Sequence, residues 1–128
     1  IISTTINAIF IFIILSIIFL FLFKSLLFTT VKLFIPILPK ELEKILFPMI
    51  MTGIVWQLSF ISHKLIELDE KTYLMTFFIS ISVLVNIVGN NLFLPRFGIV
   101  ASAYVALSCA LIYCILTLAY FYWKKLKY

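Results

Sequence analysis

Charged residues are scarce in this sequence. They make up 12% of its 128 residues, whereas hydrophobic residues make up 65%. A chain of this composition cannot cover a soluble domain with a polar surface, so we expect an integral membrane protein. The net charge of +5 does not indicate nucleic-acid binding, because the lysines and the arginine stand at the ends of hydrophobic stretches, where they would anchor helices to lipid headgroups.

Glycine, cysteine and histidine are scarce as well, with three, two and one residues respectively. The chain has no glycine-rich phosphate loop and no HExxH or GxSxG motif, so we expect neither an enzyme nor a cofactor. Cys109 and Cys114 lie five positions apart in one apolar stretch and point to different sides of a helix. His63 is expected in a loop, and these residues predict no disulfide and no metal site.

Four apolar stretches follow one another along the chain, at about 6–23, 45–62, 73–94 and 99–123. Each is close to the roughly 20 helical residues that cross a bilayer core. Runs such as AIFIFIILSIIFLFLF lack the alternation of β-barrel strands. The sequence therefore predicts an all-α polytopic membrane protein with four transmembrane helices that form part of a larger bundle.

The segment between the first two stretches is apolar but contains Pro36 and Pro39. Proline interrupts helices, so this segment is not a regular fifth span. It either lies in the membrane interface or extends the first helix as far as Pro36.

The most informative pattern is NIVGNNLFLPRFGIVASAYVA, which starts at Asn86. Asn86 and Asn90 are four residues apart and share a helix face. Pro95 is expected to stop that helix, because it cannot donate a backbone hydrogen bond. Gly98 then permits a tight reversal, so the pattern predicts a transmembrane helical hairpin.

Small side chains recur every four residues after this reversal, at Ser102, Ala106, Ala110 and Cys114. Such a row lets another helix approach closely in a membrane, where association depends on close contact and on interhelical hydrogen bonds. We therefore expect this row to be a packing face.

Polar side chains within the apolar stretches leave two interpretations open. Asn86, Asn90 and Asn91 could form hydrogen bonds between helices, which we favour, or they could line a polar substrate cavity. Gln57 lies deep in its stretch and should face protein or water rather than lipid. No Asp, Glu, Lys, Arg or His stands in the middle of any stretch, so the residues for proton or ion coupling would have to lie elsewhere, or coupling would use neutral oxygens and asparagines.

The hairpin pattern resembles that of the polysaccharide-exporter and lipid-linked oligosaccharide flippase family of the MATE-like (MOP) superfamily. Members of this family tend to carry N-x3-N-x-x-L-I-P-x-[YF]-G-[IV]-x-G-A-A near a late helical hairpin. The matching residues here are Asn86, Asn90, Leu94, Pro95, Phe97, Gly98, Ile99 and Ala103. The pattern departs at Ala101 and Ser102, where the family usually has glycine and alanine. The looser resemblance covers roughly residues 25–123.

This resemblance implies that residues 1–128 are the C-terminal transmembrane segment of a larger transporter. The expected substrate is a lipid-linked oligosaccharide of the polyprenyl diphosphate type, such as an O-antigen or capsule repeat unit, flipped across the bacterial inner membrane by alternating access. The partners would be membrane lipids and the remaining helices of the parent protein, and Ile1 in place of methionine fits missing upstream sequence. The basic cluster WKKLK and the family both favour a cytoplasmic C terminus.

Two other classes of protein fit the same features. One is a complete small four-helix membrane protein of the GtrA-like kind. The other is a structural subunit of a membrane complex, which the small-residue row and the lack of buried charge would explain. The acidic residues Glu67, Asp69 and Glu70 are expected in a solvated loop with no metal or catalytic role.

Overall fold

The structure is a computed structural model that describes residues 2–34 and 40–127. It contains four helices in the order α1 (Ile2–Phe34), α2 (Lys40–Leu68), α3 (Thr72–Phe97) and α4 (Ile99–Lys127). The described residues form helices and short turns and no strand. The predicted all-α fold is therefore confirmed.

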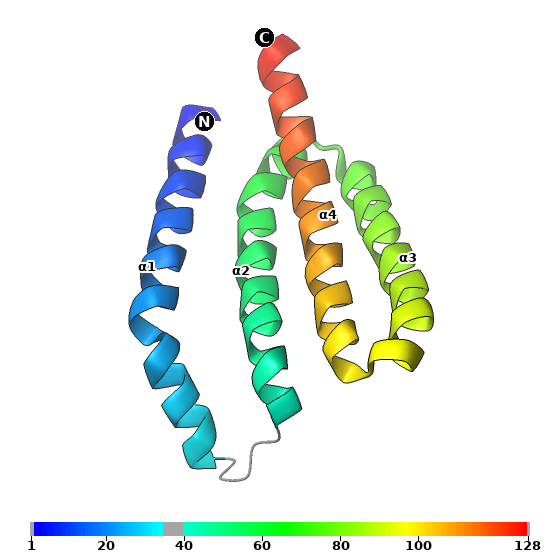
Figure 1. Ribbon diagram of the computed structural model, residues 1–128. Coiled ribbons are helices and arrows are strands. Elements are labelled where there is room, and N and C mark those ends of the chain that lie inside the picture. Colours follow the sequence, from blue (N-terminus) through cyan, green and yellow to red (C-terminus); the bar gives the residue numbers. More distant parts are fainter. Residues whose placement is uncertain (1, 35–39, 128) are drawn as a thin grey trace.

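Successive helices run in opposite directions, as Figure 1 shows. Helix α4 lies between α2 and α3 and makes extensive contact with both, whereas α1 lies on the outer side of α2 and has its main contact there. The start of α1 and the end of α4 are at the same end of the molecule. The fold is a three-helix unit with α1 beside it.

Three helices are long and apolar enough to cross a membrane. The segments concerned are Glu43–Leu68, Thr72–Phe97 and Ile99–Lys124, each of 26 residues. The apolar stretch of α1 that the structure describes, Asn7–Leu22, is shorter than these. Three of the four predicted spans thus have the required length and composition, and the crossing of α1 stays a prediction.

The helices extend further than the apolar stretches predicted. Helix α1 continues to Phe34, which is the second of the two arrangements expected for the segment that follows the first stretch. Pro36 and Pro39 lie outside the described residues. The exposed Lys32 Nζ lies 3.8 Å from a Glu43 carboxylate oxygen and so pairs the end of α1 with the start of α2.

The placement of His63 and Glu67 in a loop was wrong. Helix α2 continues to Leu68 and carries both residues, because helical hydrogen bonds do not depend on hydrophobicity and the residues after Ser62 are mostly adequate helix formers. The reversal follows at Glu70, whose φ is 57°. Its N–H donates to the carbonyl of Glu67 at 2.9 Å and closes the turn.

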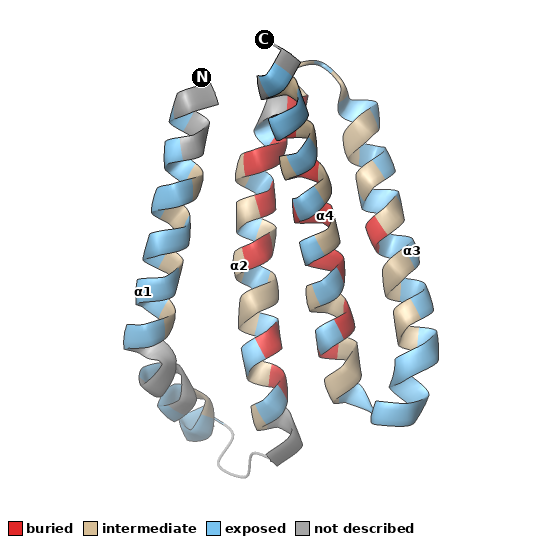
Figure 2. Ribbon diagram, turned by 45° about the horizontal axis from the view of Figure 1, so that its top comes forward, coloured by how far each residue is buried: buried red, intermediate tan, exposed pale blue. Residues whose placement is uncertain are grey.

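Buried residues gather where α2 and α4 face each other (Figure 2). Val55 on α2 packs there with Ala110 and Cys114 on α4. Helix α3 has one buried residue, Ser82, and no described residue of α1 is buried. The small core therefore belongs to the three-helix unit.

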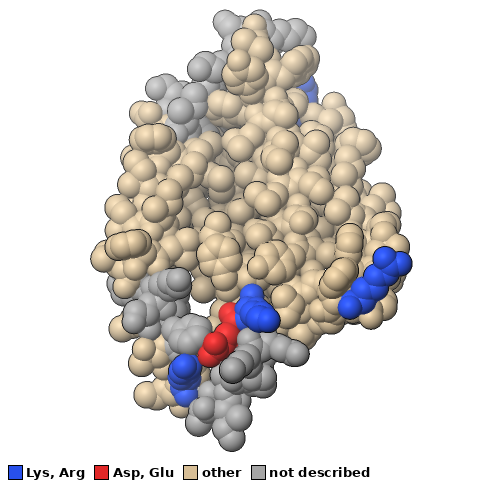
Figure 3. Space-filling model, viewed as in Figure 1, with Lys and Arg blue, Asp and Glu red and all other residues tan. Residues whose placement is uncertain are grey.

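Apolar side chains cover most of the outside of the molecule. In Figure 3 the coloured charged side chains lie towards the ends of the helices, and the broad middle of this face shows none. Large exposed residues of this surface include Phe77, Leu84, Ile87 and Leu92 on α3. Such a surface is suited to lipid tails or to further apolar helices.

Candidate functional site

The α3–α4 hairpin differs from the prediction in where its first helix ends. Pro95 does not stop α3, which continues to Phe97. A proline near the end of a helix removes only one backbone hydrogen bond, and the residues after it can still bond helically. The last turn of α3 bends over toward the start of α4 (Figure 1), as expected for a proline-induced bend.

Gly98 makes the reversal itself. Its backbone has φ 70° and ψ −163°, a combination that essentially only glycine adopts. Its N–H donates to the carbonyl of Leu94 at 2.9 Å, and α4 begins at the next residue. The glycine is exposed and no neighbouring atom would restrict a side chain there, so the constraint is one of backbone conformation alone.

The structure brings Asn86 and Asn90 together and leaves Asn91 apart. The Asn90 Nδ2 donates to Asn86 Oδ1 at 2.8 Å. This bond runs along α3, so it does not join two helices. Asn90 Oδ1 is buried and has no hydrogen-bond partner among the described residues, whereas Asn91 is exposed.

Asn86 is half-buried and lies where α3 meets α2 and α4. It lines a cavity of about 230 Å³ together with Ser82 of α3, Trp56 of α2 and Cys109 of α4. Ser82 and Asn86 are the clearly polar side chains of a mainly apolar lining. Asn86, but not Asn90, therefore lines a small, partly polar hollow between α2, α3 and α4.

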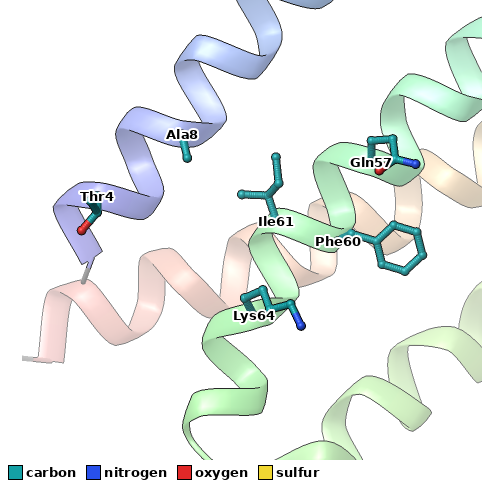
Figure 4. A pocket seen from close by; sticks show the side chains of 6 residues that line it. All are labelled: Thr4, Ala8, Gln57, Phe60, Ile61 and Lys64. Atoms are coloured by element: carbon teal, nitrogen blue, oxygen red, sulfur yellow. The ribbon is translucent and has the colours of Figure 1, made fainter.

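Gln57 lines a different hollow, a cleft between α1 and α2 (Figure 4). The cleft has a volume of about 520 Å³, and its lining residues are Thr4, Ala8, Gln57, Phe60, Ile61 and Lys64. Ile61 extends from α2 toward α1, where Ala8 faces it. Gln57 and Asn86 thus line separate hollows.

The Gln57 amide is exposed in this cleft, and no described residue forms a hydrogen bond with it. Gln57 precedes the end of the span at Leu68 by 11 residues, which is about 16 Å along a helix. An amide at this depth in a bilayer needs a hydrogen-bonding partner. The cleft therefore has a polar group available to a ligand or to water.

A second, apolar cleft lies along the line of contact between α1 and α2, which we call the α1–α2 seam. Its volume is about 450 Å³, and its lining residues are Phe12, Leu15, Ser16, Ile18, Phe19, Leu22 and Ile54. The seam thus combines a polar part near Gln57 with an apolar part. This distribution suits an amphipathic ligand whose tail requires a hydrocarbon environment.

The small residues of the row on α4 become more buried from Ser102 to Cys114. Ser102 and Ala106 are half-buried, whereas Ala110 and Cys114 are buried in the core against Val55 of α2. These small side chains let α2 and α4 approach closely.

The close contact between α3 and α4 depends on a glycine that sequence reasoning missed. A Cβ atom placed on Gly89 would lie 2.8 Å from Cγ1 of Val105. The only sequence signal for this contact was a glycine between two asparagines on one helix.

Polar bonds between α2 and α4 were also missed. The hydroxyls of Ser62 and Thr117 are 2.8 Å apart and both residues are fully buried. The Tyr113 hydroxyl lies 3.3 Å from His63 Nδ1. Polar residues recur every three or four positions near the C-terminal ends of both helices, and this spacing could have revealed the shared faces.

The turn between α2 and α3 is attached to α4 by charge. Asp69 accepts hydrogen bonds from Lys124 and, at 3.0 Å, from the Tyr120 hydroxyl. The Lys124 ammonium, followed by the Tyr120 hydroxyl, holds the pKa of the Asp69 carboxyl below its ordinary value. Lys71 lies over the Tyr120 ring, with 5.9 Å between the amine and the ring centroid.

Among the described residues there is no group of three His, Cys, Asp or Glu side chains placed to hold a metal ion.

Comparison with known proteins finds no relative of this chain. No protein-family model matches the chain, and no curated protein or solved structure is detectably similar to it.

Proposed function

We propose that this chain is a transmembrane segment of a transporter that flips a lipid-linked oligosaccharide across the bacterial inner membrane. The observation that carries the proposal is the α1–α2 seam, where the exposed Gln57 amide lies in a cleft beside an apolar cleft. A lipid-linked sugar has the same two characters. Its tail requires a hydrocarbon environment, and its head requires hydrogen-bonding groups along the path across the bilayer.

The arrangement of the helices fits alternating access, in which one group of helices moves relative to another. Helices α2, α3 and α4 pack into one unit, and α1 contacts that unit mainly through α2. Rocking of packed bundles around a polar site is a general mechanism of transporters. In this proposal the α1–α2 seam opens and closes, while the hairpin at Gly98 keeps α3 and α4 in register, and the C terminus lies in the cytoplasm.

Replacement of Gln57 tests the proposal. Gln57→Leu removes the amide and keeps a side chain of similar size, so we expect the amount of surface polysaccharide to fall about tenfold, the effect of losing roughly 1.4 kcal/mol of transition-state stabilisation. The matched control is Ser80→Leu, which places leucine at an exposed polar position of α3 outside the seam. Surface polysaccharide is measured with a lectin at equal membrane levels of each variant.

Wild-type export by Gln57→Leu at an unchanged protein level would contradict the proposal. Loss of a membrane complex without a change in lipid-linked oligosaccharide accessibility would instead identify a structural subunit.

Asn90→Leu distinguishes the two interpretations of the asparagine pair. If the pair only packs, leucine removes a buried oxygen that has no partner, and stability should be kept or raised with unchanged export. If the pair lines the substrate path, export falls while the protein stays folded. We expect the second result, because Asn90 donates a hydrogen bond to Asn86, which lines the partly polar hollow.

A further inference from the structure

His63 is the only histidine of the chain, and its ring lies between α2 and α4 with 6% of the residue exposed. Its two ring nitrogens have different neighbours. Nδ1 lies 3.3 Å from the hydroxyl of Tyr113 on α4, and Nε2 lies 3.6 Å from a carboxylate oxygen of Glu67, one turn further along α2. The ring therefore joins a neutral hydroxyl on one side to a carboxylate on the other.

These contacts define the hydrogen positions of the neutral ring. Glu67 can only accept a hydrogen bond when it is ionised, so Nε2 carries the hydrogen that faces it. Nδ1 then has a lone pair, and the Tyr113 hydroxyl donates to it. In this arrangement every polar atom of the buried pair has a suitable neighbour.

A graded series of side chains leads from solvent to the ring. The side-chain exposure is 66% for Lys64, 38% for Glu67 and 8% for His63, and Tyr113 is fully buried. Glu67 divides its two oxygens between the ring and Lys64, whose amine lies 2.6 Å away. His63 is five residues before the end of α2 at Leu68, about 8 Å along the helix, so the carboxylate connects a shallow buried site to the aqueous side.

We infer that His63 is a proton-binding site that controls the contact between α2 and α4, with the proton entering by way of Glu67. One proton is taken up from water, and the product is a ring with hydrogen on both nitrogens. The new hydrogen is on Nδ1, so Tyr113 can no longer donate to that atom and must accept from it instead. The Tyr113 hydroxyl hydrogen then needs another acceptor in a buried region.

The consequence is local and falls on one turn of each helix. Beside the His63–Tyr113 contact lies the Ser62–Thr117 hydroxyl pair, and Trp56 packs on the Tyr113 ring with centroids 5.3 Å apart. Turning the Tyr113 hydroxyl disturbs this packed group, so protonation loosens the α2–α4 contact. The charged groups that face His63 are Glu67 and Lys64 of α2; among the described side chains, α1 and α3 add none.

The test uses nuclear magnetic resonance on the full chain in lipid nanodiscs. Because there is one histidine, ¹⁵N labelling of histidine reports this ring alone. We expect hydrogen on Nε2 at neutral pH and uptake of one proton at Nδ1 on acidification. Hydrogen on Nδ1 at neutral pH, or a ring that takes up no proton while the protein stays folded, overturns the inference.

Two variants should move the titration midpoint in opposite directions. Glu67→Gln removes the anion that favours the charged ring, so the midpoint falls by about half to one pH unit. Tyr113→Phe removes the donor that favours the neutral ring, so the midpoint rises. Thr117→Val is the matched control, because it changes the same interface without touching the ring, and it leaves the midpoint where it is.

A fourth variant keeps the inference testable if Tyr113→Phe fails to fold. Lys64→Gln changes an exposed side chain and releases Glu67 from its competing cation, so the midpoint rises. Midpoints that do not respond to Glu67→Gln and Lys64→Gln show that the carboxylate does not serve the ring, and the inference is then wrong.

Discussion

Gly98 shows how one residue can determine the path of the chain. Its φ of 70° and ψ of −163° lie where a side chain is strained, at a cost of about 1–3 kcal/mol. Gly98→Ala should therefore lower the thermal unfolding temperature of the protein in detergent. Gly53→Ala is the matched control, because Gly53 is helical with open space around it, and alanine should stabilise α2 slightly. Equal shifts in the two variants would contradict this account.

Ser62 and Thr117 show how little a single membrane hydrogen bond contributes. Each hydroxyl also lies within bonding distance of a backbone carbonyl, Ser59 for the serine and Cys114 for the threonine, both at 2.9 Å. Loss of one partner therefore leaves the other hydroxyl satisfied. A double-mutant cycle of Ser62→Ala and Thr117→Val should give a coupling free energy near 0.6 kcal/mol, the usual value in a membrane. A coupling well above about 2 kcal/mol would show that neither hydroxyl uses its backbone alternative.

At the scale of the helix, the sequence predicts that a helix is present more reliably than it predicts the residues at which the helix begins and ends. Apolar length indicated four helices, because a bilayer or a buried core requires such runs, and Pro95 with Gly98 indicated the hairpin. The ends could not be read from hydrophobicity, since α2 continues through His63 to Leu68 and α3 continues past Pro95 to Phe97. Backbone hydrogen bonding, which sequence shows only indirectly, determines where these helices end.

The sides on which α3 and α4 face each other were harder to predict, because this contact depends on the shapes of the side chains. Gly89→Ala places a methyl group against Val105, at 2.8 Å from its Cγ1, so we expect destabilisation of about 1–3 kcal/mol. In a Val105→Ala background the same change should stabilise the protein by up to about 1 kcal/mol, because alanine favours the helix. The two free energies of unfolding are compared in detergent. Destabilisation in both backgrounds would mean that Val105 is not the obstacle.

The turn between α2 and α3 is held to α4 by Asp69. Its pKa is depressed by Lys124 and Tyr120, so the folded state favours the ionised carboxyl. The stability from this contact is present above the ordinary aspartate pKa of about 3.9 and is lost as the pH falls through the lower value of the folded protein. Asp69→Asn should therefore lower the unfolding temperature at pH 7 and flatten its decline below pH 4. A parallel decline in both proteins would exclude this role.

For the whole molecule, the three-helix unit and α1 contribute unequally. No described residue of α1 is buried, and its main contact is with α2. A chain lacking residues 1–39 should therefore keep the helix content and unfolding temperature of the α2–α4 unit, measured by circular dichroism. Loss of cooperative unfolding would show that α1 is needed for the core.

The candidate site could be predicted only in part, because it depends on neighbours that are far apart in sequence. The expectation that Gln57 avoids lipid identified a residue that now lines a cleft. Thr4 and Ala8 of α1 line the same cleft, and no pattern in the sequence predicts that they lie near Gln57. His63 and Tyr113 are 50 residues apart, and their contact exists only because α2 and α4 pack side by side.

The start of α1 and the end of α4 lie at the same end of the helices (Figure 1). If α1 crosses the membrane beside the other three helices, a fluorescent protein or protease site at the start of α1 and one at the end of α4 report the same compartment, whichever way the molecule is inserted. Among the described residues, the α3–α4 reversal at Gly98 lies at the opposite end of the helices. A small epitope placed near Arg96 would thus be the label that complements both termini.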